Sequence, residues 1–266
     1  MRKQLQYIKA TLLVASSWII LSGAVDAQDA TDEHLPAKRA EPFSGFNLRG
    51  RTFGGQQFWA DELVFRGFRI QRNVVTSHYR LLDEGDFRLA WGDWDACLAK
   101  LNAEKEAREL KPVSGKVVVL VHGLGRSRKF MHPIANHLRE NSDYQIVNVE
   151  YASTRAGIDS HAAGLASVIR HLDREITEIN FVSHSLGGLV VRHYLADATR
   201  DDKLLDPRIK RFVMLGPPNQ GAAMARLFKN VPLYNVALRG TGRQLAVDFD
   251  ALAEHMGVPP CEFAII

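Results

Sequence analysis

Cysteine is scarce in this chain of 266 residues, which contains only Cys97 and Cys261. So few cysteines exclude the disulfide framework of a small secreted scaffold, and their neighbours do not supply the clustered ligands of a metal site. In an oxidising compartment the two thiols could form one disulfide bond, but we expect two separate buried thiols. The sequence thus predicts no metal ion and no cofactor.

An excess of charge of one sign is also lacking. The 34 basic residues are scattered among 30 acidic ones, and the formal net charge is only +4. No nucleic-acid partner is therefore expected. Hydrophobic residues make up 46% of the chain, enough for the core of one large α/β domain. The oligomeric state is left open.

A hydrophobic run long enough to span a membrane is lacking as well. Basic residues precede an apolar stretch at residues 11–25, which is shorter than the ~20 residues that a spanning helix needs. Small residues at Val25 and Ala27 suit a signal peptidase, so residues 1–27 are predicted to be a signal peptide. The protein would then be exported to the periplasm or the extracellular space. The alternative is a membrane anchor retained at residues 11–25.

Residues 28–45 are polar, show no apolar periodicity and are predicted to be a linker. The predicted folded domain spans residues 46–266. In its first part, residues 46–112, aromatic and β-branched runs broken by turn residues predict a short antiparallel lead-in. A helix from about Asp93 to Leu110 is predicted to close this part.

From residue 116 onward, apolar runs alternate with helical stretches. A continuous apolar run such as 117–121 is typical of a strand in a parallel sheet that is covered by helices on both faces. Strands are predicted at 117–121, 145–150, 178–183 and 209–215, helices at 129–140, 160–174 and 186–198, and the opening of a fifth strand at 262–266. This alternation predicts an α/β fold with a doubly wound, mostly parallel sheet. The segment 222–258 is either a lid or, as we favour, helices packed on the sheet.

A strand, a tight turn and a helix start follow one another around Ser185, in the sequence Phe-Val-Ser-His-Ser-Leu-Gly-Gly. A nucleophile elbow, G-x-S-x-G, needs small residues two before and two after its serine, because strand and helix backbones approach it closely. Gly187 fills the second position, and Ser183 stands where the motif has glycine. The alternative is an ordinary loop with a helix-capping serine. We predict the elbow, with Ser185 as nucleophile.

The loop His-Gly-Leu-Gly-Arg-Ser begins at His122, directly after the 117–121 strand. Such a loop can direct a backbone N–H toward the carbonyl of a substrate bound at the nucleophile. Leu124 is the predicted donor here, with His122 and Gly123 supporting it, unless the loop is a simple turn with an incidental histidine. The N–H of Leu186, at a helix N-terminus, is the other predicted oxyanion donor.

These two motifs, with Leu-Gly-Pro-Pro-Asn-Gln-Gly at residues 215–221, resemble the lipases and esterases of the α/β-hydrolase superfamily, especially bacterial lipases with His-Gly-x-Gly and x-His-Ser-x-Gly-Gly motifs. The resemblance covers residues 116–222. It implies the α/β-hydrolase fold, Ser185 as nucleophile, carboxylic ester or lipid ester substrates, and transient contact with a membrane or lipid surface.

In that superfamily the serine is followed in the chain by an acid and then by a histidine. The acid is expected after the strand that begins at Glu262, so the sequence is expected to be truncated before its triad is complete, or to be an inactive remnant. His193 lies two turns into the helix behind Ser185 and cannot accept its proton. His255, in a predicted helix with nearby carboxylates, is the remaining, weaker candidate base.

The sequence therefore predicts a serine carboxylic ester hydrolase that forms an acyl-enzyme on Ser185. A thioesterase or an acyltransferase would use the same elbow. A catalytically incomplete α/β-hydrolase-like protein with a binding role is the alternative from a different class, and the missing acid and base favour it if the chain is complete.

Overall fold

The computed structural model describes residues 50–51, 56–200, 205–218 and 254–266. The chain divides into two units, Met1–Ala40 and Glu41–Ile266, and all described residues belong to the second. The predicted signal peptide and linker, and residues 222–253 of the predicted lid or helical segment, lie outside the described residues and stay predictions. None of the described helices is both long and apolar enough to cross a membrane.

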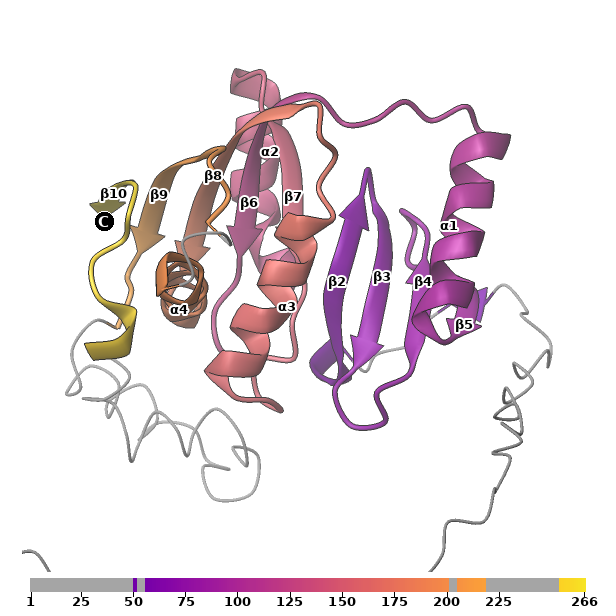
Figure 1. The fold of residues 1–266 in the computed structure, drawn as a ribbon, viewed down its shortest axis with the longest axis horizontal. Coiled ribbons are helices and arrows are strands. Elements are labelled where there is room, and N and C mark those ends of the chain that lie inside the picture. The colour runs from indigo at the N-terminus through magenta and orange to yellow at the C-terminus, as the bar shows by residue number, and fades with distance from the viewer. Residues whose placement is uncertain (1–49, 52–55, 201–204, 219–253) are drawn as a thin grey trace, which may run out of the picture. The chain divides into compact units, whose positions relative to one another are not determined.

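Five parallel strands form the sheet that carries the predicted nucleophile (Figure 1). Their order is β10-β9-β8-β6-β7, and every neighbouring pair runs parallel. The strands are β6 (Gly115–Val121), β7 (Gln145–Val149), β8 (Ile176–His184), β9 (Ile209–Leu215) and β10 (Glu262–Ile265). The predicted parallel α/β sheet is confirmed, with all five predicted strands in place.

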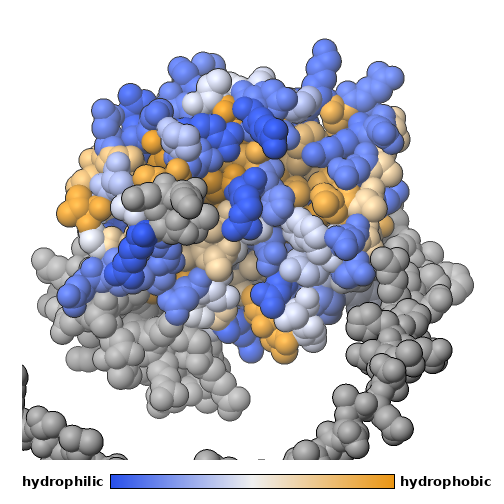
Figure 2. All heavy atoms as spheres, viewed as in Figure 1, coloured by the Kyte–Doolittle hydropathy of each residue, from blue (hydrophilic) through white to orange (hydrophobic). Residues whose placement is uncertain are grey.

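Helices cover both faces of this sheet, which explains why β6 is apolar throughout. On one face, Val117, Val119 and Val121 pack with α3 (Ile158–Arg170) and α4 (Leu186–Arg200). On the other face, Val118 and Leu120 pack with the 3-10 turn η2 (Arg128–Met131) and α2 (His132–Asn141). Successive residues of a strand point to opposite faces, so a strand between two helix layers needs an apolar residue at every position. Hydrophilic residues predominate on the outer face shown in Figure 2.

A second, antiparallel sheet precedes the parallel one in the chain, in the order β1-β5-β4-β3-β2. One of its faces packs on α1 (Trp94–Ala107), around buried side chains such as Leu63, Ile70 and Leu101. The Asp93 side chain accepts a hydrogen bond from the N–H of Ala96 and so caps this helix. The strands are β1 (Gly50–Arg51), β2 (Trp59–Phe65), β3 (Phe68–Asn73), β4 (Tyr79–Leu82) and β5 (Phe87–Gly92), and the 3-10 turn η1 (Gln56–Phe58) precedes β2. The predicted antiparallel lead-in is confirmed.

A buried polar network joins the two sheets. The Asp61 carboxylate of β2 accepts hydrogen bonds from Arg69, from Gln71 (2.7 Å) and from the backbone N–H of Glu150 (2.8 Å). Arg69 also donates to the carbonyl of Asn148 in β7 (2.9 Å). Burial raises the pKa of Asp61, although the guanidinium of Arg69 opposes that effect. Removing one partner would leave a buried charge uncompensated, so this network fixes β2 against β7.

Both cysteines are free thiols in the structure. Cys97 lies fully buried in the core between α1 and the antiparallel sheet, where burial raises its pKa to about 12. Cys261 is only half-buried, just before β10. A thiol with so high a pKa is a poor nucleophile, so Cys97 acts as a core residue.

Candidate active site

Ser185 occupies a strained turn between the end of β8 and the first residue of α4. Its φ is 52°, in the left-handed region that a non-glycine residue rarely adopts. Its backbone N–H donates to the carbonyl of Leu215 at the end of β9 (2.9 Å), and its carbonyl accepts from Gly188 (2.9 Å). Such strain persists only where the surroundings enforce it, and a nucleophile elbow is one such place.

Two glycines allow the helix to start this close to the sheet. A Cβ atom on Gly187 would lie 2.5 Å from the carbonyl oxygen of Val121 and 2.6 Å from that of His122. On Gly188 it would lie 3.1 Å from the Cβ of Pro217. Gly187 is therefore required because α4 begins against the backbone at the end of β6.

Ser183, which replaces the first glycine of the motif, is completely buried in β8. Its hydroxyl has no hydrogen-bond partner within the described part of the chain. It lies 3.4 Å from where a Cβ on Gly188 would be. The position is thus tightly enclosed, but it has room for a side chain of two heavy atoms. This clearance explains in physical terms how the elbow tolerates serine there.

The loop after β6 lies directly against the elbow. A Cβ atom on Gly123 would lie 3.2 Å from the Cβ of Ser185 and 2.9 Å from Nδ1 of His184. Leu124 follows at once, and its backbone N–H has no acceptor among the hydrogen bonds of the described residues. The N–H of Leu186, at the first position of α4, has no acceptor within the helix. The loop that contains Leu124 and the first residue of α4, Leu186, therefore both adjoin Ser185.

Gln57 of η1 holds this loop in place, although it lies far away in the sequence. Its Nε2 donates to the carbonyl of Arg126 (2.8 Å). Its Oε1 accepts from the hydroxyl of Ser153 (3.2 Å) and from both the N–H and the hydroxyl of Thr154 (3.1 and 2.9 Å). The Ser153 hydroxyl in turn accepts from the N–H of Gly125 (3.0 Å). A side chain from the antiparallel part thus fixes the backbone at Gly125 and Arg126, directly after the predicted oxyanion donor Leu124.

Arg128 anchors the far end of the same loop. Its guanidinium binds both carboxylate oxygens of Asp86, in the turn between β4 and β5. Its backbone N–H donates to Glu150 (3.1 Å), and its carbonyl accepts from Asn148 (2.9 Å). One guanidinium nitrogen thus contacts both carboxylate oxygens, and this ion pair ties the start of η2 to the turn between β4 and β5. Neither Gln57 nor Asp86 was identified from the sequence, because no local motif marks them.

The two motif histidines have different surroundings. His122 is fully buried and stacks on Tyr151, with ring centroids 4.3 Å apart, and the Tyr151 hydroxyl donates to its carbonyl (2.6 Å). These contacts with Tyr151 fix the backbone at the start of the loop. His184 packs against Phe130, with centroids 4.8 Å apart. Burial lowers the pKa of His184, and the nearby Arg126 lowers it further.

The histidines behind Ser185 do not reach it. At 1.5 Å per residue, His193 is displaced by about 12 Å along α4, and Asp197 by about 18 Å. The Nε2 atom of His255 lies 2.7 Å from Asp197 Oδ1, so its ring lies beside the second half of this helix. In the described residues, no histidine ring nitrogen is hydrogen-bonded to the Ser185 hydroxyl. The weaker prediction that His255 is the base does not agree with this arrangement, because its ring lies beside Asp197, well along α4 from Ser185.

The carboxyl ends of β8, β9 and β10 lie together at one edge of the sheet, next to the elbow. The N–H of Ile266 donates to the carbonyl of Met214 (2.9 Å), and its own carbonyl accepts from Gly216 (2.8 Å). The N–H of Ser185 is hydrogen-bonded to the carbonyl of Leu215, so the ends of all three strands are aligned there. Ligands of parallel α/β sheets bind at this edge.

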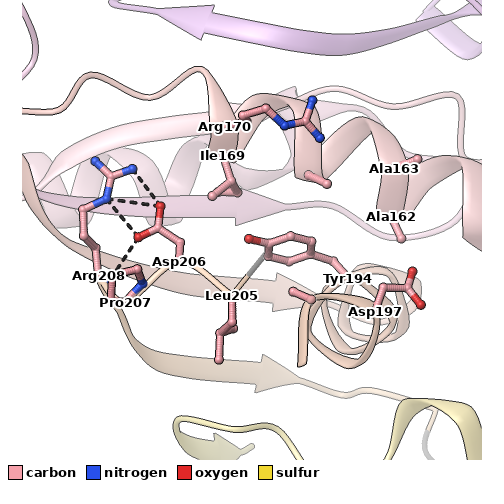
Figure 3. A pocket seen from close by; sticks show the side chains of 12 residues that line it. Ala162, Ala163, Ile169, Arg170, Tyr194, Asp197, Leu205, Asp206, Pro207 and Arg208 are labelled. Atoms are coloured by element: carbon pink, nitrogen blue, oxygen red, sulfur yellow. Dashed lines mark hydrogen bonds and ion pairs between the residues drawn. The ribbon is translucent and has the colours of Figure 1, made fainter. Parts of the chain in front are cut away.

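A hollow of about 550 Å³ lies elsewhere, between α3 and α4 (Figure 3). Its wall is mainly apolar, with Ala162 and Ile169 on α3 and Tyr194 on α4. The ion pair of Asp206 and Arg208 lies at one end. None of its lining residues belongs to the elbow or to the loop after β6, so this hollow is separate from the candidate active site.

Residues 112–237, just under half of the chain, match the family described as "Putative serine esterase (DUF676)". The matched segment contains Leu124, Ser185 and Leu186, the residues that the parallel sheet brings together. Over this segment the chain is therefore similar to a family of putative serine esterases. No curated protein matched the chain.

Several solved structures are similar to this chain at low sequence identity. The Bacillus licheniformis lipase BlEst2 in its mature form is 17% identical, over 59% of this chain and 67% of that one, with a TM-score of 0.43. The Paleococcus ferrophilus monoacylglycerol lipase is also 17% identical, over 57% of this chain and 75% of the other, with a TM-score of 0.38. The Listeria innocua lin2722 product is 16% identical, over 57% and 68%, with a TM-score of 0.38.

Proposed function

We propose that this esterase-like domain is a serine carboxylic ester hydrolase that forms an acyl-enzyme on Ser185. The observation that carries the proposal is the strained Ser185, with φ of 52°, packed so closely by the loop after β6 that a Cβ atom added to Gly123 would lie 3.2 Å from the Ser185 Cβ. This closeness supports Leu124, the next residue in the loop, and Leu186, the next residue after Ser185, as the proposed N–H donors. Two such donors stabilise the negative charge on the carbonyl oxygen as the tetrahedral intermediate forms.

The proposed reaction has two halves. Ser185 Oγ bonds to the ester carbonyl carbon while its proton passes to a base, and the intermediate expels the alcohol, which takes up that proton. Water then attacks the acyl-enzyme, releases the carboxylic acid and restores the Ser185 hydroxyl. A thioester, or an alcohol acceptor in place of water, would use the same nucleophile and the same donors. The base and its acid partner are not assigned among the described residues.

The proposal is tested by treating the purified 266-residue chain with a fluorophosphonate probe, which bonds to activated serines. Labelling should be lost in Ser185→Ala and retained in Ser183→Ala, a matched variant that removes a nearby buried hydroxyl. Hydrolysis of p-nitrophenyl esters of different acyl length should follow the same pattern. A folded chain that neither labels nor hydrolyses these esters would contradict the proposal and favour the binding role.

A further inference from the structure

Two histidines and an aspartate from distant parts of the chain meet beside the second half of α4. His193 and Asp197 lie one turn apart on this helix, and His255 lies on a short helical segment before β10. One ligand atom from each of the three side chains can be chosen so that all three atoms lie within 4.8 Å of one another. The two imidazole rings are also close, with centroids 4.3 Å apart.

His193 is in an unusual position because both of its ring nitrogens face carboxylates. Its Nδ1 lies 3.0 Å from Asp197 Oδ2, and its Nε2 lies 2.9 Å from Asp159 Oδ1 on α3. A neutral imidazole has one N–H and can donate to only one of these carboxylates. The other nitrogen then directs a lone pair at an oxygen that also carries lone pairs. A cation between Nδ1 and Asp197 would remove this repulsion between lone pairs.

We propose that His193 Nδ1, Asp197 and His255 Nε2 bind a divalent transition-metal ion, with Zn²⁺ as the best chemical match. Two imidazole nitrogens and one carboxylate suit Zn²⁺, which binds such ligands at about 2.1 Å. Tetrahedral ligands at that length are about 3.4 Å apart, and the present contacts of 2.7 Å and 3.0 Å to Asp197 need only a small expansion. Asp159 would accept the Nε2–H of His193, as carboxylates do behind metal-bound histidines.

Two arginines complete the surroundings of this site. The Arg200 guanidinium contacts Nδ1 of His255, so in this arrangement Nε2 carries the ring proton and donates to Asp197. Metal binding moves that proton to Nδ1 and requires Arg200, which lies at the end of α4, to turn toward solvent. Arg192 donates to the carbonyl of Gly257 (2.6 Å) and already fixes the segment that carries His255.

The ion would act as a structural clamp. The site is displaced by about 12 to 18 Å from Ser185 along α4, too far for the metal to reach a substrate held there. It joins α3 and α4 to the segment that leads into β10, an edge strand whose only described strand partner is β9. Binding to the folded state alone stabilises that state in proportion to the logarithm of the free metal concentration. The clamp does not depend on the proposed esterase reaction.

The test uses the full chain, stripped with a chelator and then titrated with Zn²⁺ in a calorimeter. We expect one ion per chain with a Kd of about 1 µM or below, a higher Tm with Zn²⁺, and a visible absorption band when Co²⁺ is used instead. The nearly isosteric Asp197→Asn, and His255→Gln, should each weaken Zn²⁺ binding about 100-fold. Asp159→Asn should weaken it about tenfold.

His137→Gln is the control, because it removes an exposed histidine on α2 and should leave the Kd and the stoichiometry unchanged. Circular dichroism shows whether each variant is folded. No Zn²⁺ binding by the wild-type chain up to about 100 µM would overturn the proposal. Equal affinity in wild type, Asp197→Asn and His255→Gln would overturn it as well, because the ion would then be bound elsewhere.

Discussion

Replacing Gly187 by alanine tests whether the elbow is enforced by backbone contact. The added Cβ would lie 2.5 Å from the carbonyl oxygen of Val121 and 2.6 Å from that of His122, and both belong to backbone at the end of β6. Overpacking a core costs about 1–3 kcal/mol when side chains can move aside. Backbone can yield less, so we expect a loss of about 3 kcal/mol or more.

Gly164→Ala is the matched control, since it makes the same chemical change inside α3. Its Cβ would meet only the Asp61 carbonyl, at 3.6 Å, which is ordinary contact. Alanine is favoured over glycine in a helix by about 0.5–1 kcal/mol, so this variant should be slightly more stable than the wild type.

Urea and thermal unfolding measure both variants. In a domain of this size 1 kcal/mol corresponds to about 2–4 °C in Tm, so Gly187→Ala should lower Tm by about 6–12 °C and Gly164→Ala should raise it by about 1–4 °C. Gly187→Ala should also lose fluorophosphonate labelling at temperatures where it is still folded. A Gly187→Ala protein as stable and as reactive as the wild type would refute the close approach of α4 to β6.

Two further predictions concern single side chains. Gln57→Ala should slow fluorophosphonate labelling of Ser185 about tenfold, because the loop around Leu124 loses bonds worth about 1–1.5 kcal/mol; an unchanged labelling rate would contradict this positioning role. Burial, and then the nearby His122, lower the pKa of His161 to about 3. Below about pH 6.5, His161 is therefore protonated in the unfolded chain but stays neutral in the folded chain. The free energy of unfolding consequently falls as the pH is lowered toward 3. Between pH 7 and pH 5 His161 should contribute about 2 kcal/mol of that loss. Urea unfolding of His161→Gln should show a correspondingly flatter pH dependence, and an identical slope would contradict the assignment.

The parallel sheet could be predicted from the sequence because each of its elements has a local signal. The run around Val119 is apolar at every position, as a strand between two helix layers must be. The antiparallel sheet was predicted only in outline. Asp61, Arg69 and Gln71 are buried in this sheet. Polar residues that alternate with apolar ones along a strand normally indicate a face exposed to solvent. Only the tertiary structure shows that these charges satisfy one another.

The candidate site divides in the same way. Ser185 and Leu124 were identified because strand, turn and helix start follow one another within a few residues. Gln57 could not be identified from the sequence, because its hydrogen-bond partners lie 69 to 97 residues away along the chain. The i and i+4 spacing of His193 and Asp197 places them on one side of a helix, a signal that the sequence does contain. Their meeting with His255, however, depends on how the chain returns to α4.

The antiparallel sheet is best regarded as part of the candidate active site. The family match begins at residue 112, yet Gln57 and Asp86, which bind Arg126 and Arg128 in the second half of the loop after β6, both precede it. An oxyanion donor is effective only when its position is fixed before the charge develops. In this protein that position depends on side chains outside the matched segment. The matched segment contains the proposed nucleophile and donors, and side chains that precede it hold the loop in which one of the proposed donors lies.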